Sequence, residues 1–243
     1  MIKFFRKIRQ NLLLENKTGK YLKYAIGEIV LVVIGILIAL SINNLNNNIK
    51  DRKLEKQYIS SLINDLEADS IVISKIKMVS NEQVKRKNKL IEYFGGKQYT
   101  NDSIAHFFSS QWEITYEFNP ITITIDELKS TGRIGLIQNS STRKQIIKTY
   151  NTYENFTNNF QSYYERGREE LRKIALKIPR VFNNELTVNS KTPDIIDALN
   201  NDELKNRVLA NYAVTLNEKL QILQNQNELL LNQLKKYESD IQK

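Results

Sequence analysis

The feature that most constrains this chain is an apolar run from Tyr24 to Ile42, which is interrupted by a single charged residue, Glu28. A helix of about 20 residues covers the roughly 30 Å hydrocarbon core of a bilayer. The run therefore predicts a transmembrane helix over residues 24–42. It divides the 243 residues into a short basic head, residues 1–23, and a long polar body.

The charges on the two sides of the run predict its direction. The head holds seven basic residues and one acid, whereas residues 43–48 carry no charge. Basic residues return only between Lys50 and Lys56, mixed with Asp51 and Glu55. Because the more basic flank stays in the cytoplasm, we expect a single-pass protein of the bacterial inner membrane. The N-terminus would be cytoplasmic and the C-terminal body periplasmic.

A cleavable signal peptide is the competing interpretation of the same run. The stretch from Ile29 to Leu40 has the length of a signal-peptide core, and Ala39-Leu40-Ser41 offers a small-residue cleavage site. The long head and the lack of a turn-promoting residue before that site favour an uncleaved anchor. The head itself fits either an amphipathic helix on the inner leaflet or simply the charge that orients insertion.

One face of the predicted transmembrane helix combines an acid with small residues. At 100° per residue, Gly35 and Ala39 lie within about 20° of Glu28. Small residues four apart let two membrane helices approach closely. The face predicts contact with a second copy or with another membrane protein. The alternative is that Gly and Ala are simply common in membrane helices and that Glu28 reaches the headgroups.

The body shows helical rather than strand periodicity. The whole chain has only eight glycines and three prolines. Apolar residues recur at alternating spacings of three and four in three long stripes, over residues 59–94, 146–178 and 209–241. The centre of the first stripe is polar and contains Asp69, Ser80, Gln83 and Lys87. Gly95-Gly96 and Pro179 are predicted to end the first two helices.

Shorter segments lie between the stripes. Residues 103–112 and 193–199 are predicted to be short helices, and Thr124 to Glu127 fits a capping box that opens a helix ending at Gly132. We therefore predict an all-α fold, in which one N-terminal transmembrane helix precedes an elongated antiparallel bundle of long heptad-patterned helices. The predicted domains are the basic amphipathic cytoplasmic head 1–23, the transmembrane helix 24–42, a polar connector 43–53 and the extracytoplasmic bundle 54–243.

Asn227 occupies an interior position of the third stripe. A polar residue at such a position can fix helix register or oligomeric state. The simpler interpretation, which we favour, is that Asn227 faces a polar neighbour within one chain. Similarly, Tyr150, Tyr153 and Tyr164 are expected in the core rather than in a ligand groove.

The sequence contains no recognisable catalytic, cofactor or metal motif. His106 is the only histidine, cysteine is absent, and neither G-x-S-x-G, a P-loop nor G-x-G-x-x-G occurs. We therefore predict no enzyme activity, no cofactor and no metal site. The net charge of +9 is concentrated in the head, so binding of nucleic acid is not expected either.

Several blocks resemble a family of uncharacterised single-pass membrane proteins from flavobacteria and related Bacteroidota. The blocks are Phe4 to Arg9, Glu15 to Glu28, Ile34 to Leu40 and, more weakly, Leu128 to Ile137. Members often carry Gln and Trp where this chain has Ser41 and Leu45. The resemblance implies an inner-membrane protein with an extracytoplasmic helical domain, and it implies no activity.

These observations favour a membrane-anchored helical interaction or scaffold module. Its expected partners are the lipid bilayer and a second copy or another membrane protein, bound through the transmembrane helix. The alternative is a ligand-sensing subunit that signals through a membrane partner. The second role would need such a partner because the head is too short for an output domain.

Overall fold

The computed structural model describes residues 18–109, 117–182, 188–210 and 213–242. It divides into two units, Met1–Glu55 and Lys56–Lys243, each of which is described by itself. One helix, α2 (Thr18–Phe94), contributes to both units. Most of the predicted basic head, residues 1–17, lies outside the described residues.

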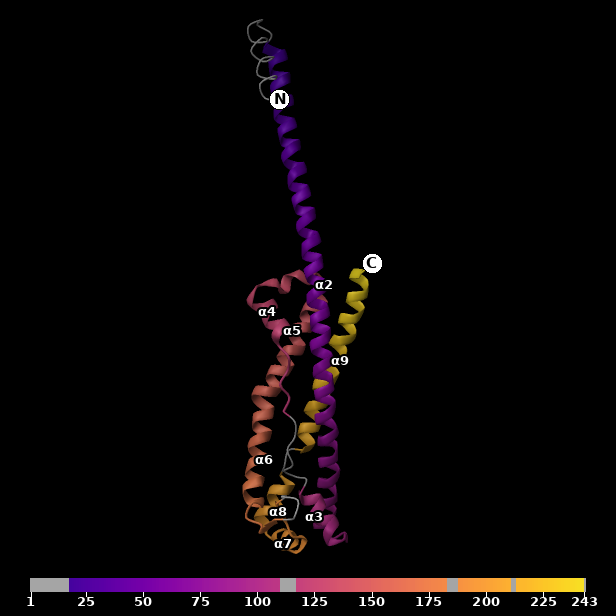
Figure 1. Ribbon diagram of the computed structural model, residues 1–243, viewed down its shortest axis with the longest axis vertical. Coiled ribbons are helices and arrows are strands. Elements are labelled where there is room, and N and C mark those ends of the chain that lie inside the picture. Colours follow the sequence, from indigo (N-terminus) through magenta and orange to yellow (C-terminus); the bar gives the residue numbers. More distant parts are fainter. Residues whose placement is uncertain (1–17, 110–116, 183–187, 211–212, 243) are drawn as a thin grey trace. The chain divides into compact units, whose positions relative to one another are not determined.

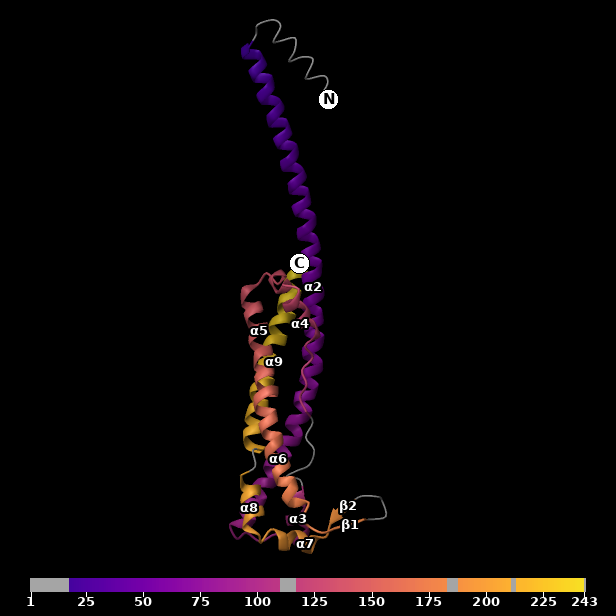
Figure 2. The same ribbon diagram turned by 90° about the vertical axis from the view of Figure 1, so that its left-hand side faces the viewer.

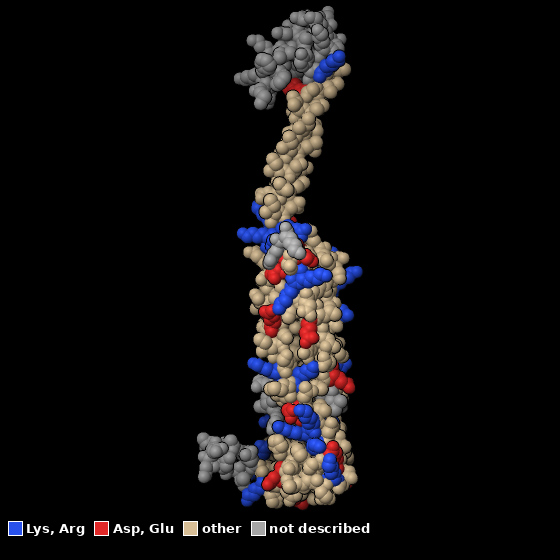
Figure 3. All heavy atoms as spheres, turned by 90° about the vertical axis from the view of Figure 1, so that its right-hand side faces the viewer, with Lys and Arg blue, Asp and Glu red and all other residues tan. Residues whose placement is uncertain are grey.

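In the first unit, α2 contains the predicted transmembrane segment. Every residue from Ile29 to Lys50 is exposed, and the stretch between Glu28 and Lys50 carries no charged side chain (Figure 3). By length and composition this is the one helix, within the described ranges, that could cross a membrane, although a signal sequence passes the same test. Residues 43–53, the predicted connector, are helical and belong to α2 without a break.

The C-terminal end of α2 is a glycine cap, as the sequence predicts. Gly96 has a φ of 97°, the left-handed conformation that glycine adopts without a Cβ clash. Its N–H donates to the carbonyl of Tyr93 at 2.9 Å, and Lys97 N–H donates to the carbonyl of Glu92 at 3.0 Å. These two bonds form the Schellman motif, which satisfies carbonyl groups that the helix end leaves unpaired.

The second unit continues from α2 through short helices into two further long ones (Figure 1). In chain order the remaining elements are α3 (Asn101–Ser109), α4 (Ile123–Ser130), the 3-10 helix η2 (Arg133–Leu136), α5 (Ser140–Asn155), the π-helix η3 (Phe156–Gln161), α6 (Ser162–Ala175), β1 (Arg180–Phe182), β2 (Val188–Ser190), α7 (Thr192–Ala198), α8 (Asp202–Leu209) and α9 (Ala213–Gln242). Within this unit α2, α5 and α9 lie side by side (Figures 1 and 2). The predicted all-α class is confirmed.

Two short strands add a feature that the sequence analysis did not predict. β1 and β2 pair as an antiparallel hairpin, with Val181 opposite Asn189 (Figure 2). Each strand has three residues, so neither is long enough to show the alternation by which a strand is recognised. The hairpin follows Pro179, where the second predicted stripe ends.

The three predicted stripes supply much of the buried interior, with two departures. Asp69, Ser80, Gln83 and Lys87 of the first stripe are all buried. The second stripe is not one regular helix, because the π-helix η3 shifts the buried position from the expected Thr157 to Phe156. The third helix begins at Ala213, whereas Leu209 ends α8 and is exposed.

The predicted capping box at Thr124 is wrong. α4 already begins at Ile123, its N-cap is Thr122, and Thr124 is buried. The expected reciprocal partner, Glu127, instead accepts a hydrogen bond of 2.5 Å from the hydroxyl of Tyr58 on α2. Tertiary packing thus uses both residues that local sequence assigned to a cap.

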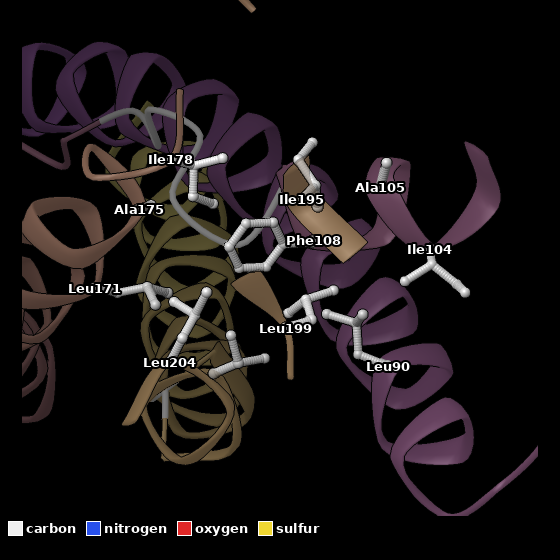
Figure 4. Packing of buried hydrophobic residues seen from close by; sticks show 11 residues of the cluster. Leu90, Ile104, Ala105, Phe108, Leu171, Ala175, Ile178, Ile195, Leu199 and Leu204 are labelled. Carbon is white, nitrogen blue, oxygen red and sulfur yellow. The ribbon is translucent and has the colours of Figure 1, made fainter. Parts of the chain in front are cut away.

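A cluster of buried apolar side chains lies at the end of the second unit where α2 ends. It joins side chains from α2, α3, α6, α7 and α8, and Phe108 lies near its centre (Figure 4). The members are Leu90, Ile104, Ala105, Phe108, Leu171, Ala175, Ile178, Ile195, Leu199, Leu204 and Val208. Burial of this much apolar surface holds the short helices in place.

Candidate functional site

The predicted membrane face occupies consecutive turns of α2. Glu28 is half-buried, whereas Gly35 and Ala39 are exposed. A Cβ atom added at Gly35 would meet no atom within 4 Å. The part of the face at Gly35 and Ala39 is thus open for contact with another helix, and association through the face stays a prediction.

Asn227 is fully buried and joins three helices of the second unit. Its side-chain Nδ2 donates to the backbone carbonyl of Leu66 on α2 at 2.9 Å and to the hydroxyl of Tyr153 on α5 at 2.7 Å. Both contacts are within one chain, and a role of Asn227 in register or oligomeric state stays a prediction. Its Oδ1 atom is buried and has no hydrogen-bond partner among the described residues.

A buried carboxylate lies in the same neighbourhood. Asp69 on α2 is 1% exposed, and its Oδ1 accepts a hydrogen bond of 3.1 Å from the backbone N–H of Ile121. Its Oδ2 is buried without a partner in the described residues, as is Oδ2 of Asp65 one turn earlier. Burial, followed by the negative charge of Asp65, raises the pKa of Asp69 to about 6, against the opposing effect of the Ile121 hydrogen bond.

Two tyrosines of α5 complete this group, which we call the polar cluster: Asp65, Asp69, Tyr150, Tyr153 and Asn227. The two tyrosine rings pack edge to face with centroids 5.6 Å apart. Burial raises the pKa of both hydroxyls, and the charge of Asp69 raises both further. The Tyr150 hydroxyl is buried without a described partner. The tyrosines are therefore core residues, as expected, and their hydroxyl groups lie in the buried interior rather than in solvent.

A second polar contact lies farther along α2. The hydroxyl of Tyr164 on α6 donates to Oε1 of Gln83 at 3.3 Å. Burial raises the pKa of the Tyr164 hydroxyl to about 12. Burial also lowers the pKa of Lys87, which lies one turn after Gln83 on α2. One residue of the polar centre of the first stripe, Gln83, thus has a polar partner on α6.

The surface of the second unit offers a cavity of about 310 Å³ between α6, α7 and α8. Its floor is apolar, with Ile174, Ile178 and Leu204. Its rim carries three carboxylates and one cation, namely Asp194, Asp197, Glu203 and Lys177. The size falls at the lower end of the range of ligand sites, about 300–1,000 Å³, and the charge favours a cationic ligand.

Residues that sequence patterns associate with chemistry are not brought together. His106 lies exposed in the last turn of α3. Within the described ranges, no group of three or more His, Asp or Glu side chains has the arrangement of a metal site. On the face shown in Figure 3, basic and acidic side chains are mixed along the unit.

The polar cluster was only partly visible in the sequence. Asp69 and Asn227 stand out because they interrupt apolar stripes. Asp65 is not on the stripe, and Ile121 contributes only a backbone N–H. No sequence pattern marks either of these two, because their proximity depends on how the helices pack.

Comparison with known proteins gives one match. The model of the "Family of unknown function (DUF6090)" matches residues 28–212 of the chain. No curated protein and no solved structure matches. The matched range includes Glu28, Gly35, Ala39, Asp69 and Tyr150, and it ends before Asn227.

Proposed function

We propose the following role for this chain, which belongs to the DUF6090 family of unknown function: a membrane-anchored helical interaction module without enzyme activity. Residues 24–42 would span a bacterial inner membrane, with the head in the cytoplasm and the bundle 54–243 in the periplasm. The carrying observation is that α2 exposes apolar side chains on all sides from Ile29 to Leu40. Such a surface is stable in lipid and not in water.

Two further observations support a binding role for the body. On α2, Ile71 and Met78 are exposed and lie seven residues apart, and Ile222 and Leu229 on α9 have the same relation. Residues seven apart share a helix face. A groove of about 430 Å³ between η3 and α9 runs beside Ile222 and is lined also by Phe160 and Tyr163. Adjacent exposed apolar side chains are typical of surfaces that contact other proteins.

The interaction partner inside the membrane would be a second copy or another helix bound through Glu28, Gly35 and Ala39. Small residues allow close helix contact, and an acid beside them can hydrogen-bond across the interface. Asn227 would act separately, by fixing the register of α9 against α2 and α5.

The test has two parts, topology and association. An enzyme reporter that is active only outside the cytoplasm, fused after Lys243, should be active. An expressed but inactive fusion would place the C-terminus in the cytoplasm and overturn the orientation. Crosslinking in native membranes, followed by purification of the full chain, should trap a dimer or a defined partner. Recovery of monomer alone, with no co-purifying protein, would count against the interaction role.

A second candidate, a ligand-sensing subunit that signals through a membrane partner, is favoured by the acidic cavity between α6, α7 and α8. A ligand with an amine and a short apolar part matches its rim and floor. Spermidine is a suitable probe. It should raise the melting temperature of the full chain in micelles, and Asp194→Asn with Asp197→Asn should abolish this shift. Absence of any shift with such amines would remove the support for this candidate.

A further inference from the structure

We propose that the polar cluster is a proton-binding site, in which Asp69 takes up a proton under mildly acidic conditions and exchanges its contact with the segment before α4 for a contact with α5 or α9. The site would make the packing of the second unit responsive to pH. This inference is independent of the proposed interaction role, because it concerns the interior of the body and not the membrane face.

The carboxylate of Asp69 lies in the interior of the second unit. Asp69 is 1% exposed and has one described hydrogen-bond donor, the backbone N–H of Ile121. Ile121 lies two residues before α4 begins. A deprotonated Asp69 therefore holds the segment leading into α4 against α2 by a charge-assisted hydrogen bond.

The described surroundings of Asp69 carry acidic and neutral groups. Asp69 forms no ion pair within the described ranges. Among the described residues, the titratable groups that face this neighbourhood are Asp65 on α2, Asp126 on α4 and the hydroxyls of Tyr150 and Tyr153 on α5. α9 presents the neutral amide of Asn227, and the segment before α4 presents a backbone N–H. None of these groups is a cation. Burial and the charge of Asp65 disfavour a negative charge on Asp69, and the hydrogen bond from Ile121 opposes them only in part.

A proton on Asp69 would supply a hydrogen-bond donor to a group of buried oxygens. Asp69 Oδ2, Tyr150 Oη and Asn227 Oδ1 are buried oxygens without a described partner. Asn227 Oδ1 is an amide oxygen and can only accept, and Asp69 Oδ2 can only accept while the carboxyl is ionised. A protonated Asp69 gains an O–H donor in a cluster of buried oxygens, where the charge of its ionised form acts on the hydroxyls of Tyr150 and Tyr153. Its remaining carbonyl oxygen is a weaker acceptor for Ile121. Burial of unpaired polar oxygens is costly, so the proton relieves an unfavourable arrangement.

The direction of the pH effect follows from the pKa. The pKa of Asp69 is about 6 in the folded chain and 3.8 as a reference value. The folded state therefore binds the proton more tightly than the unfolded state does. Stability attributable to Asp69 is gained as the pH falls through about 6 towards the reference value, and it is lost again as the pH rises.

The first experiment measures this linkage on the full chain in micelles by thermal unfolding at pH 7.5 and pH 5, followed by near-UV circular dichroism of the buried tyrosines. We expect the wild-type melting temperature to be higher at pH 5 by roughly 3–6 °C. Asp69→Asn, which mimics the protonated acid, should melt higher than wild type at pH 7.5 and should lose most of the difference between the two pH values. Asp240→Asn, at an exposed position of α9, is the matched control and should behave as wild type does.

The second experiment does not require a variant to be stable. Carboxyl ¹³C NMR of the wild-type chain labelled at aspartate should show one resonance that titrates with a midpoint near pH 6, where the pKa of Asp69 lies. Its assignment follows from its loss in Asp69→Asn. Titration of every aspartate near the ordinary value of about 3.9 would overturn the proposal. So would a melting temperature that falls at pH 5 by the same amount in the wild-type chain and in the Asp69→Asn variant.

Discussion

Nδ2 of Asn227 lies 2.7 Å from the hydroxyl oxygen of Tyr153, and both side chains are completely buried. The same Nδ2 reaches the carbonyl of Leu66, so one amide connects α9 with α5 and with α2. A leucine would suit this stripe position by pattern alone. The amide instead makes the packing of three helices depend on one set of hydrogen-bond partners, which is the means by which a buried polar residue selects a single register.

Asn227→Ala should lower the free energy of unfolding by about 2–4 kcal/mol, because it leaves both acceptors without this donor and opens a small cavity. Chemical denaturation of the full chain in micelles measures the change. Asn232→Ala, exposed on the same helix, should be close to neutral. Equal losses for the two variants would contradict a specific role for the Asn227 amide.

Gly96→Ala should destabilise the body by about 1 kcal/mol, because alanine disfavours the positive φ that the Schellman motif requires. The neighbouring Gly95 does not have a positive φ, and a Cβ there would lie 3.4 Å from the carbonyl oxygen of Glu92. Gly95→Ala should therefore cost less. Thermal unfolding of the two variants measures the difference. Equal losses would contradict a specific requirement for glycine at position 96.

Thr124→Val should be tolerated, with a loss below about 1 kcal/mol, because Thr124 is a buried side chain and not an N-cap. Asn139→Ala is the comparison. The Asn139 side chain accepts from Thr142 N–H at 3.0 Å as the true N-cap of α5. Its loss should cost about 1 kcal/mol. If Thr124→Val proves the more damaging of the two in denaturant titrations, the assignment of α4's start is incorrect.

Gly35→Leu should reduce crosslinked dimer or partner in native membranes severalfold, because a bulky side chain blocks close approach of helices along the predicted face. Gly27→Leu is the matched control. Gly27 is about 100° away from Glu28 around the helix, so it lies off the predicted face. A Cβ atom added at Gly27 or at Gly35 would have no atom of the chain within 4 Å. A uniform effect of both substitutions would point to altered insertion, whereas no effect of either would remove this face from the interaction.

Sequence patterns predicted helix type and burial well where a stripe was long. The cap at Gly96 and the buried residues Asp69 and Asn227 follow from spacing alone. The π-helix at Phe156 and the use of Glu127 by Tyr58 could not be predicted. Both depend on side chains that come from distant parts of the chain, and local propensity has no information about them.

The candidate site was harder to predict than the fold. Asp69 and Asn227 are 158 residues apart along the chain. Their relation to Tyr150 depends on the packing of three helices. Stripe interruptions indicated that polar residues were buried, but not that they share one neighbourhood with the backbone of Ile121.

The hydrogen bond between Asn227 and the carbonyl of Leu66 spans 161 positions of the chain. A growing polypeptide therefore cannot close its interior until α9 has been synthesised and, on the proposed topology, exported. Until then α2 and α5 carry Asp69, Tyr150 and Tyr153 without the third helix that packs beside them in the folded chain. The body should accordingly fold late and as a unit, and a chain interrupted before Ala213 should be a substrate for quality-control proteases rather than a smaller functional protein.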